Sequence, residues 1–496
     1  MSKADKKFSP KEIEKMFPTI RLTNIILENF RNVEHGEIML CNEKAFATPN
    51  IESNILGIYG QNGSGKTAII EALQILKILM SGDKLDAKFV DCISVDKDFA
   101  KLEFSFNFHS PDVKTILHAT YSFCLKTEEQ NSSKKDNDII FSNNIIDKNY
   151  QHIENVIDSE KKYKVVVFNE MFYLNESNSR KQIIINTSPK NTPFIPDTKR
   201  KNLAGGKNQD QVLELAKSIA YANSKSFIFS EETLAIFRKH NNKEICTLVL
   251  VMFHIYASHY LFVLPTKSSA LIRANQSLPL FFRLGTIEFD SKEPLVIPEK
   301  AIPIVKSIIK NISLVLEQLV PGLAINIKQL SETLIKENET TEKAFNVILV
   351  AYRGNKEFPI RYESDGVRRT ISILSLLIYA FNNPTITLAI DEFDAGIYEY
   401  LLGEILQVME EYGKGQFIFT SHNLRPLEVI NKKFICFTTT NPQNRFYRLK
   451  NIAATNNLRD TYFREIMFND QKEKLYEGTK QFKIVDAFIK AGGGDD

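Results

Sequence analysis

The sequence is poor in cysteine, and the few cysteines that it has form no motif. They stand far apart, with no C-x-x-C pair and no histidine at metal-ligand spacing: Cys41, Cys92, Cys124, Cys246 and Cys436. A disulfide scaffold or a zinc-binding module needs paired or clustered cysteines. The pattern therefore excludes both and predicts reduced thiols in a cytoplasmic protein.

An excess of charge of either sign is also lacking. The chain has 63 Lys and Arg residues against 60 Asp and Glu residues, a formal net charge of +3. This balance excludes a strongly basic molecule that binds nucleic acid over its whole surface, so any such contact must be local. The cluster Lys199-Arg200-Lys201 is a candidate for a local contact, although a solvated loop is the simpler explanation.

Segments that would place the chain in a membrane are scarce. Residues 1–15 are charged and lack the apolar core of a secretory signal. The one long apolar run, Ile245 to Leu264, is interrupted by His254, Ser258 and His259. We interpret it as a buried helix that passes into a strand at 260–264, so no membrane association is expected. Sustained heptads and internal repeats are lacking too, which excludes a long coiled coil.

A phosphate-binding loop is the most informative segment that is present. Residues 60–67 read Gly-Gln-Asn-Gly-Ser-Gly-Lys-Thr, between an apolar strand at 55–59 and a helix that opens at 68. In that setting, the glycines let backbone N–H groups wrap the phosphates, Lys66 reaches the β- and γ-phosphates, and Thr67 ligates Mg²⁺. The predicted nucleotide-binding residues of the loop are Gly60, Asn62, Gly63, Ser64, Gly65, Lys66 and Thr67.

A second apolar strand distinguishes an ATPase from other nucleotide-binding proteins. The apolar run 384–390 is followed directly by Asp391 and Glu392, which is the pattern of a Walker B strand. Asp391 would hold the Mg²⁺ shell, and Glu392 would orient and polarise the attacking water. A further apolar strand, 416–421, ends at His422, where a γ-phosphate sensor would sit. Lys66, Glu392 and His422 are the predicted catalytic residues.

A candidate signature segment lies between the loop and the acidic strand. Ser364-Asp365-Gly366 opens an apolar helix that runs to Phe381. A hydroxyl, backbone amides and the helix dipole together favour an anion, although such a segment by itself is more often an ordinary N-cap. The order of phosphate loop, signature helix, acidic strand and histidine strand resembles that of ATP-binding-cassette heads. In those heads the signature closes over the nucleotide of the other protomer, so we assign Ser364 and Gly366 to nucleotide binding across a homodimer.

The two ends of the chain carry a closer resemblance. Asn29-Phe30-Arg31-Asn32 ends an expected strand ahead of the loop, and Asp391-Glu392-Phe393-Asp394-Ala395 follows the second motif. Both resemble the SMC, RecF and OLD-like branch of cassette ATPases. The segments 363–369 and 476–492 are similar to those of abortive-infection ATPases typified by RloA, AbiL and the ATPase of the PARIS phage-defence system.

The resemblance implies an α/β fold, a P-loop NTPase of the ABC-ATPase head type, with a mixed sheet, flanking helices and a helical insertion. It implies ATP and Mg²⁺ as cofactors and adds Arg31 to the nucleotide-binding residues. It also implies a homodimer or higher homo-oligomer with composite ATP sites. The expected partner is a separately encoded effector, a TOPRIM- or HNH-type nuclease, with a phage product as the trigger.

Two positions depart from the cassette pattern. Tyr398 stands where the D-loop usually has an aspartate. The expected strands at 100–108 and 114–126 offer no glutamine in an obvious place for a Q-loop. Communication between the composite sites is therefore expected to differ from that in SMC proteins.

Composition along the chain predicts three parts. Residues 1–190 form the N-terminal part of the ATPase head, with the phosphate loop and a strand-rich lobe. Residues 191–320 form a linker rich in Pro, Lys, Asn and Gly and then a helical insertion, because apolar residues recur at helical spacing from Gln211 onward. Residues 321–496 complete the head with the signature, the Walker B strand, the histidine strand and a C-terminal tail.

Three functions remain open at this point. The first is an ATP-hydrolysing sensor or trigger of an anti-phage abortive-infection system that controls a separate effector. The second is a DNA-repair or recombination ATPase of the RecF or SMC type. The third is a scaffold clamped by ATP that does not hydrolyse it, and Glu392 argues against this because its carboxylate would be superfluous. The resemblance favours the first.

Overall fold

The computed structural model describes residues 18–40, 54–109, 116–129, 163–176, 182–186, 208–241, 245–266, 277–282, 285–290, 293–337, 340–449, 457–468 and 472–492. Most of the expected linker and the basic cluster Lys199-Arg200-Lys201 lie outside these ranges.

A largely parallel sheet carries the two nucleotide motifs. Its strand order is β18-β17-β3-β16-β15-β8, in which only β18 pairs antiparallel with its neighbour. The strands are β3 (Asn54–Tyr59), β8 (Leu261–Leu264), β15 (Thr387–Ile390), β16 (Gln416–Thr420), β17 (Ile435–Thr438) and β18 (Phe446–Tyr447). Their short, nearly all-apolar sequences suit a parallel sheet that is covered on both faces. Because the carboxyl ends of parallel strands meet at one edge, the loops after β3, β15 and β16 converge there.

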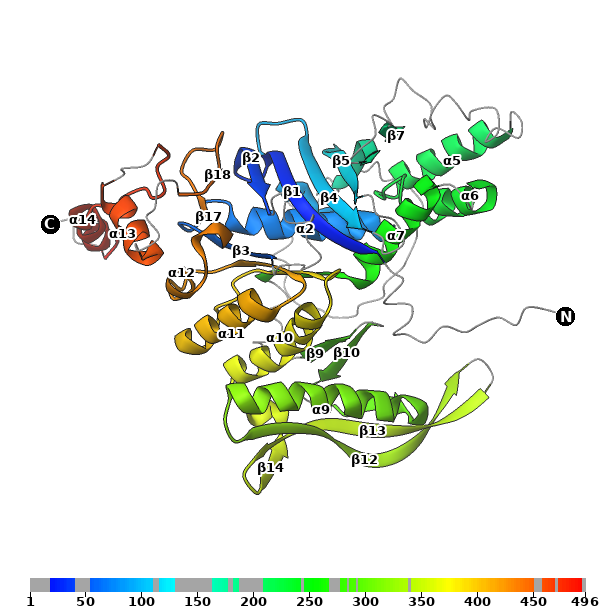
Figure 1. The fold of residues 1–496 in the computed structure, drawn as a ribbon, viewed down its shortest axis with the longest axis vertical. Coiled ribbons are helices and arrows are strands. Elements are labelled where there is room, and N and C mark those ends of the chain that lie inside the picture. The colour runs from blue at the N-terminus through cyan, green and yellow to red at the C-terminus, as the bar shows by residue number, and fades with distance from the viewer. Residues whose placement is uncertain are drawn as a thin grey trace, which may run out of the picture.

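An antiparallel sheet lies over the parallel one, with helix α2 (Lys66–Met80) between them (Figure 1). Its strand order is β2-β1-β4-β5-β6-β7. The strands are β1 (Thr19–Phe30), β2 (Val33–Met39), β4 (Ala100–His109), β5 (Ile116–Glu129), β6 (Tyr163–Glu176) and β7 (Gln182–Asn186). Side chains of α2 such as Ile69, Leu73 and Leu76 are fully buried. The helix is thus clamped by apolar contacts, and its N-terminus is fixed at the phosphate loop.

The segment after the linker is helical only in part. Helices α5 (Asn208–Ala222), α6 (Glu231–Asn241) and α7 (Ile245–His259) follow one another, and α7 passes into β8 as the sequence predicted. The expectation of helix over 277–298 is wrong, because β9 (Ser277–Phe282), β10 (Gly285–Asp290) and β11 (Leu295–Pro298) form there. β9 and β10 pair with each other, and β11 pairs with β13 far along the chain. Runs this short cannot be assigned from periodicity alone. The division at 190/191 and 320/321 stays a prediction.

A second lobe lies on the other side of the parallel sheet (Figure 1). Strands β12 (Leu323–Glu337) and β13 (Thr340–Arg353) form a long hairpin, and β11 and β14 (Lys356–Pro359) pair with β13. Helix α9 (Ile302–Leu319) packs on β12, and α10 (Asp365–Asn382) packs on α9 and β9. Helix α11 (Glu399–Tyr412) lies beside α10 (Figure 1). The signature segment therefore starts a helix that connects this lobe to β15.

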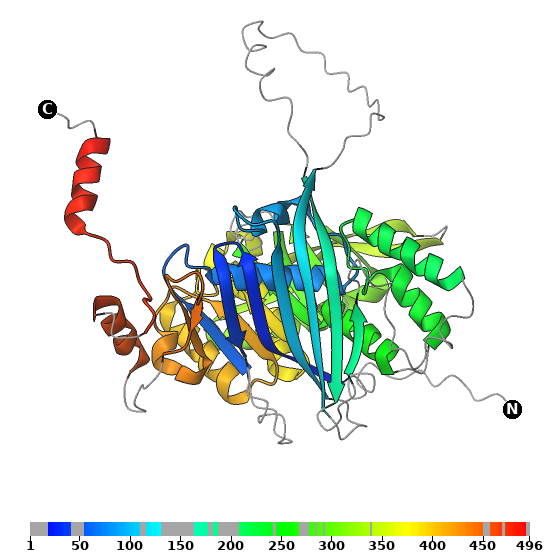
Figure 2. The ribbon, with the colours of Figure 1, turned by 90° about the horizontal axis from the view of Figure 1, so that it is seen from above.

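The chain closes with α12 (Pro426–Val429), α13 (Leu458–Phe468) and α14 (Gln481–Ala491), and α14 stands off from the body (Figure 2). Within the described ranges, no helix combines the length and apolar character needed to cross a membrane. Phosphate loop, α10, acidic strand and histidine strand share one mixed α/β framework. The predicted P-loop NTPase fold class is confirmed.

Candidate functional site

Three glycines with positive φ shape the phosphate loop. The φ angle is 154° at Gly60, 74° at Gly63 and 95° at Gly65, and other residues rarely adopt such values. A Cβ on Gly60 would meet the Thr438 hydroxyl oxygen at 1.8 Å, so only glycine fits between the loop and β17. Gly65 is the N-cap of α2. The positive end of the helix dipole therefore begins at the loop, where it favours a phosphate.

The Lys66 ammonium lies against the loop. Its Nζ donates hydrogen bonds to the carbonyl oxygens of Gly60 at 2.8 Å and Gln61 at 3.0 Å. Burial lowers the pKa of Lys66, and the nearby carboxylates of Asp391, Asp394 and Glu392 act in the opposite direction. The lysine is thus held at the loop with negative charge facing it from the end of β15.

Two hydroxyls hold the buried carboxylate of Asp391. Thr420 Oγ1 donates to Asp391 Oδ1 at 2.5 Å, and the Thr266 hydroxyl donates to Oδ2. Thr420 ends β16 and Thr266 follows β8, and these are the two strands that pair with β15. Both neighbours in the sheet therefore fix the orientation of the carboxylate at the carboxyl edge.

Glu392 has a left-handed backbone conformation, with a φ of 48°. A non-glycine residue in this region costs about 1–3 kcal/mol and persists only where its surroundings hold it. Its N–H donates to Thr420 Oγ1 at 2.8 Å, and its carbonyl accepts from the buried guanidinium of Arg369. The peptide groups on both sides of Glu392 are thus held.

These groups line one cavity of about 510 Å³. The predicted residues that line it are Arg31, Asn62, Gly63, Gly65, Lys66, Thr67, Asp391, Glu392 and His422. The cavity volume lies in the range of small-molecule sites. Gly60 and Ser64 support the loop instead, and the Ser64 hydroxyl donates to the Gln61 carbonyl at 2.5 Å. The loop, the acidic strand and the histidine strand are therefore brought together around a single space.

Arg31 reaches this cavity from the turn between β1 and β2. Its Nε and Nη2 donate to the two carboxylate oxygens of Glu71, each at 2.7 Å. Glu71 lies on α2 and also lines the cavity. The hydrogen bond to Glu71 is the main cause that raises the pKa of Arg31. The pairing fixes a guanidinium at the rim while leaving it partly exposed.

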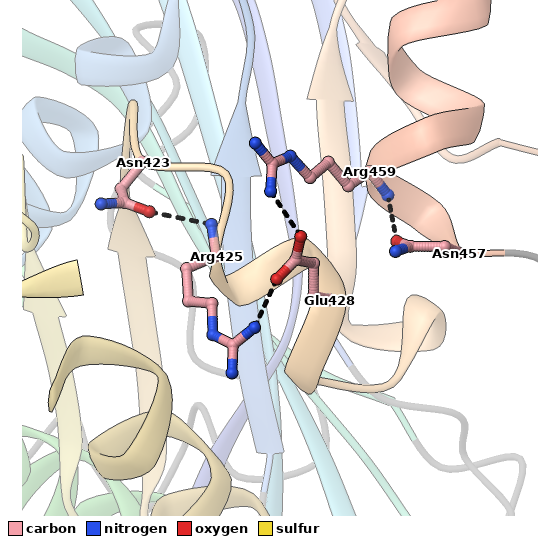
Figure 3. A network of polar contacts seen from close by, with 5 residues as sticks. All are labelled: Asn423, Arg425, Glu428, Asn457 and Arg459. Carbon is pink, nitrogen blue, oxygen red and sulfur yellow. Dashed lines mark hydrogen bonds and ion pairs between the residues drawn. The ribbon is translucent and has the colours of Figure 1, made fainter. Parts of the chain in front are cut away.

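The histidine loop is held by a carboxylate and by a network behind it. The backbone N–H groups of His422 and Asn423 donate to Asp394 Oδ2 at 3.2 and 3.0 Å. Farther along, Glu428 accepts from Arg425 and from Arg459, each at 2.5 Å (Figure 3). The bonds from Arg459 and Arg425 lower the pKa of Glu428.

Figure 3 also shows how the ends of that network are capped. The side-chain oxygen of Asn423 accepts from Arg425 N at 2.8 Å, and that of Asn457 accepts from Arg459 N at 2.9 Å. Because Asn457 and Arg459 lie at the start of α13, the loop after β16 is fastened to the C-terminal part of the chain.

The signature segment lies outside the cavity of its own chain. Ser364 is exposed, and its hydroxyl caps α10 by accepting from Val367 N at 3.3 Å. A Cβ on Gly366 would meet the carbonyl oxygen of Gly396 at 2.3 Å, so the start of α10 packs closely on the loop after β15. Arg369, one turn farther along α10, reaches the Glu392 carbonyl. Neither Ser364 nor Gly366 lines the cavity.

Several residues of the site were not assigned a role from the sequence. Thr420, Asn32 and Glu71 line the cavity, and Thr266 and Arg369 hold the Walker B pair. The Q-loop glutamine was sought at 100–108 and 114–126, which are β4 and β5 of the antiparallel sheet. The strands that flank β15 are β8 and β16, and neither β4 nor β5 pairs with it. One signal in the sequence could have identified Thr266 and Thr420. Each lies at the carboxyl end of an apolar strand, where the residues of such a site gather.

Comparisons with known proteins place the motifs in a family. A family model described as "AAA domain, putative AbiEii toxin, Type IV TA system" matches residues 159–428, which include the Walker B pair. A second model, described as "AAA domain", matches residues 24–248, which include the phosphate loop. Comparison with curated proteins gives no match.

Similar solved structures include an Smc head domain and a recombination mediator protein. The Smc head domain with an extended coiled coil, bound to the C-terminal domain of ScpA and derived from Pyrococcus furiosus, is 12% identical with a TM-score of 0.37. That match covers 87% of this chain and 96% of the other. The recombination mediator protein RecF with ATP is 13% identical with a TM-score of 0.33, covering 82% of this chain and 94% of the other.

Proposed function

This chain belongs to the family described as "AAA domain, putative AbiEii toxin, Type IV TA system", and from that premise we propose that it hydrolyses ATP as the trigger subunit of an abortive-infection system. The proposal has two parts, a chemical one and a biological one. The chemical part depends on the cavity at the carboxyl edge of the parallel sheet. The biological part depends on the family and on the segments that resemble phage-defence ATPases.

The residues of the cavity fit a nucleotide with a divalent cation. The Gly60–Lys66 loop and the start of α2 offer backbone N–H groups and a positive dipole to the phosphates. Asp391 accepts from two neutral hydroxyls, which leaves its negative charge for a cation, and Thr67 adds a hydroxyl that lines the cavity. Oxygen donors of this kind suit Mg²⁺. Bound Mg-ATP would supply the reacting γ-phosphate and neutralise part of its charge.

The observation that carries hydrolysis, rather than binding alone, is the conformation of Glu392. Its backbone has a φ of 48° and is held by Thr420 and Arg369 on either side. Such strain is retained where a side chain has to be aimed. Glu392 lines the cavity together with Lys66, so it is the group best placed to accept a proton from an attacking water. Lys66 would exchange its loop carbonyls for phosphate oxygens.

Two substitutions separate binding from turnover. Glu392→Gln should retain ATP affinity and lose turnover by about 100-fold or more, because only the proton acceptor is removed. Lys66→Ala should lose ATP affinity, because the ammonium group that pairs with the negative phosphates is removed. Nucleotide affinity by fluorescence titration and phosphate release check both, with the exposed Glu399→Gln as the matched control. Equal loss of affinity in Glu392→Gln and Lys66→Ala would remove the general-base role.

For the biological part, we expect the ATPase to act in the cytoplasm and to restrain a separately encoded effector, a TOPRIM- or HNH-type nuclease, until a phage product is sensed. Phage challenge of cells that carry this gene with its neighbour should arrest growth only when Lys66 and Glu392 are intact. Two outcomes would change the assignment. Growth arrest by this chain alone would make it the toxin itself, and protection from DNA damage with unchanged phage plating would favour a repair ATPase of the RecF or SMC type.

A further inference from the structure

An apolar groove lies between helices α9, α10 and α11, on the lobe that carries the signature helix. Its volume is about 670 Å³, and its apolar lining includes Leu319, Leu377, Phe381, Val408 and Met409. Val408 is 48% exposed although it faces this groove. The charged residues that line the groove are both glutamates, Glu404 and Glu411. The groove is thus apolar along its floor and negative at its edge.

Helix α14 presents a matching apolar surface, and every one of its residues is exposed. Its large apolar residues are exposed, with Phe488 at 76% and Phe482 at 67%. At 100° per residue, these two and Ile484, Val485 and Ile489 fall on one half of the helix. Lys483, Asp486 and Lys490 fall on the other half. A helix with so wide an apolar face needs a partner surface to be stable in water.

The two surfaces agree in length. The apolar stripe from Phe482 to Ile489 covers seven steps of the helix, which is about 10 Å at 1.5 Å per residue. The wall that α11 gives to the groove runs from Glu404 to Glu411, also seven steps. An amphipathic helix that fills a hydrophobic groove through anchors at this spacing is a common mode of recognition.

The two surfaces agree in charge as well. Segment 480–491 contains Lys480, Lys483 and Lys490 against one acidic residue, Asp486. The groove contributes Glu404 and Glu411. The lysines do not lie on the apolar stripe, so their effect is on the approach of the two surfaces rather than on direct ion pairs at the floor.

The tether of α14 favours docking on another molecule. Leu475 is buried, the Lys474 carbonyl accepts from Thr440 N at 2.8 Å, and Glu477 N donates to the Gln61 side chain at 3.0 Å. Only residues 478–480 separate this anchor from α14, so the four steps from Glu477 to Gln481 reach about 14 Å at most. In neither view does α14 lie over helices α9, α10 and α11 (Figures 1 and 2). We infer that α14 of one copy docks in the α9–α10–α11 groove of a second copy of this chain.

Charged substitutions on either surface test the docking. In nucleotide-free protein, Phe488→Glu and Val408→Glu should each weaken self-association roughly tenfold or more, because each buries a carboxylate among apolar side chains. Molar mass by light scattering across a concentration series measures this. Lys483→Glu, on the other half of α14, and Leu314→Glu, exposed on α9 and outside the groove, are the matched controls. Self-association that is unchanged in Phe488→Glu, or a wild type that stays monomeric, would overturn the inference.

Cross-linking identifies the occupant. Val408→Cys protein mixed with Phe488→Cys protein should give a disulfide-linked dimer that contains one chain of each, and neither should do so alone. Wild type controls for the native thiols, of which Cys92, Cys124 and Cys436 are buried. The double variant, with Val408→Cys and Phe488→Cys in one chain, tests the alternative. A disulfide that forms only within single chains of this variant would mean that α14 folds back on its own groove. If Phe488→Glu no longer binds the protein encoded by the neighbouring gene but still self-associates, α14 docks on that partner instead. Either result would refute docking on a second copy.

Discussion

Thr420 connects the two acidic residues that carry the proposed chemistry. Its hydroxyl donates to Asp391 Oδ1 and accepts from Glu392 N, so one oxygen orients the carboxylate and holds the strained peptide. At the residue scale, this explains how Glu392 keeps a φ of 48°. The site therefore depends on a side chain that no motif identified.

Removal of that hydroxyl should affect stability and turnover together. Thr420→Val keeps the shape of the side chain but removes the acceptor of the Glu392 N–H and the donor to Asp391 Oδ1, which should cost about 1–3 kcal/mol in the free energy of unfolding. Turnover should fall because Glu392 is no longer fixed. Denaturant unfolding and steady-state ATPase assays measure the two effects. Thr420→Ser should recover most of both, and a Val variant equal to wild type would contradict the role.

Gly366 is required for a different reason, the close approach of the start of α10 to the loop after β15. A Cβ at this position would lie 2.3 Å from the Gly396 carbonyl oxygen, which belongs to the backbone and cannot turn away. Gly366→Ala should therefore push the start of α10 from the loop after β15 and lower both the thermal midpoint and turnover. At Gly478 nothing lies within 4 Å, so Gly478→Ala is the matched control. Equal effects of the two substitutions would remove this packing argument.

At the scale of elements, the histidine loop depends on a helix near the C-terminus. Glu428 on α12 accepts from Arg425 in the same loop and from Arg459 on α13 (Figure 3). Arg425 also lies over the ring of Tyr400 on α11, 4.9 Å from its centroid. Four separate elements therefore meet behind His422, and the position of the loop reflects all of them.

Because of this network, the stability of the protein should fall as the pH is lowered. The pKa of Glu428 is lowered from its ordinary value of 4.5 by Arg459 and Arg425. Its stabilisation is therefore present above pH 4.5 and is lost as the pH falls through the lowered pKa. Glu428→Gln should reduce the thermal midpoint at pH 7, and the difference from wild type should shrink as the pH is lowered below 4.5. Glu317→Gln, exposed on α9, serves as the control. A difference that stays constant with pH would mean that the charge of Glu428 does not contribute.

Elements whose signals are local could be predicted from the sequence. β3, the loop and α2 follow one another, and α10 begins at the N-cap Ser364 where the signature segment was expected. The strand β8 was also expected, but not its place beside β15, because the order of strands in a sheet is set by contacts between distant segments. Thr266 was missed for that reason. The strands β9 to β11 were missed because runs of four to six residues cannot be assigned from periodicity alone.

At the scale of the whole molecule, the signature segment and the cavity are connected but separate. Arg369 and Gly396 join the start of α10 to the loop after β15, yet Ser364 and Gly366 do not line the cavity of their own chain. An exposed Ser364 at a helix N-terminus is available to a phosphate that another chain brings. This is the arrangement that a composite site between two copies requires.

Complementation between inactive subunits tests that arrangement. Ser364→Arg should abolish hydrolysis while its own phosphate loop still binds ATP, and Lys66→Ala should be inactive because its loop is impaired. When the two are mixed, half of the dimers contain one of each, and one of their two sites combines an intact loop with an intact signature. The mixture should therefore regain roughly a quarter of wild-type turnover. Lys66→Ala mixed with Glu392→Gln is the control, since both changes lie in the cavity of one chain and no intact site can form. Native mass spectrometry shows whether the subunits exchange. If they exchange and the first mixture is still inactive, the composite site between two chains is contradicted.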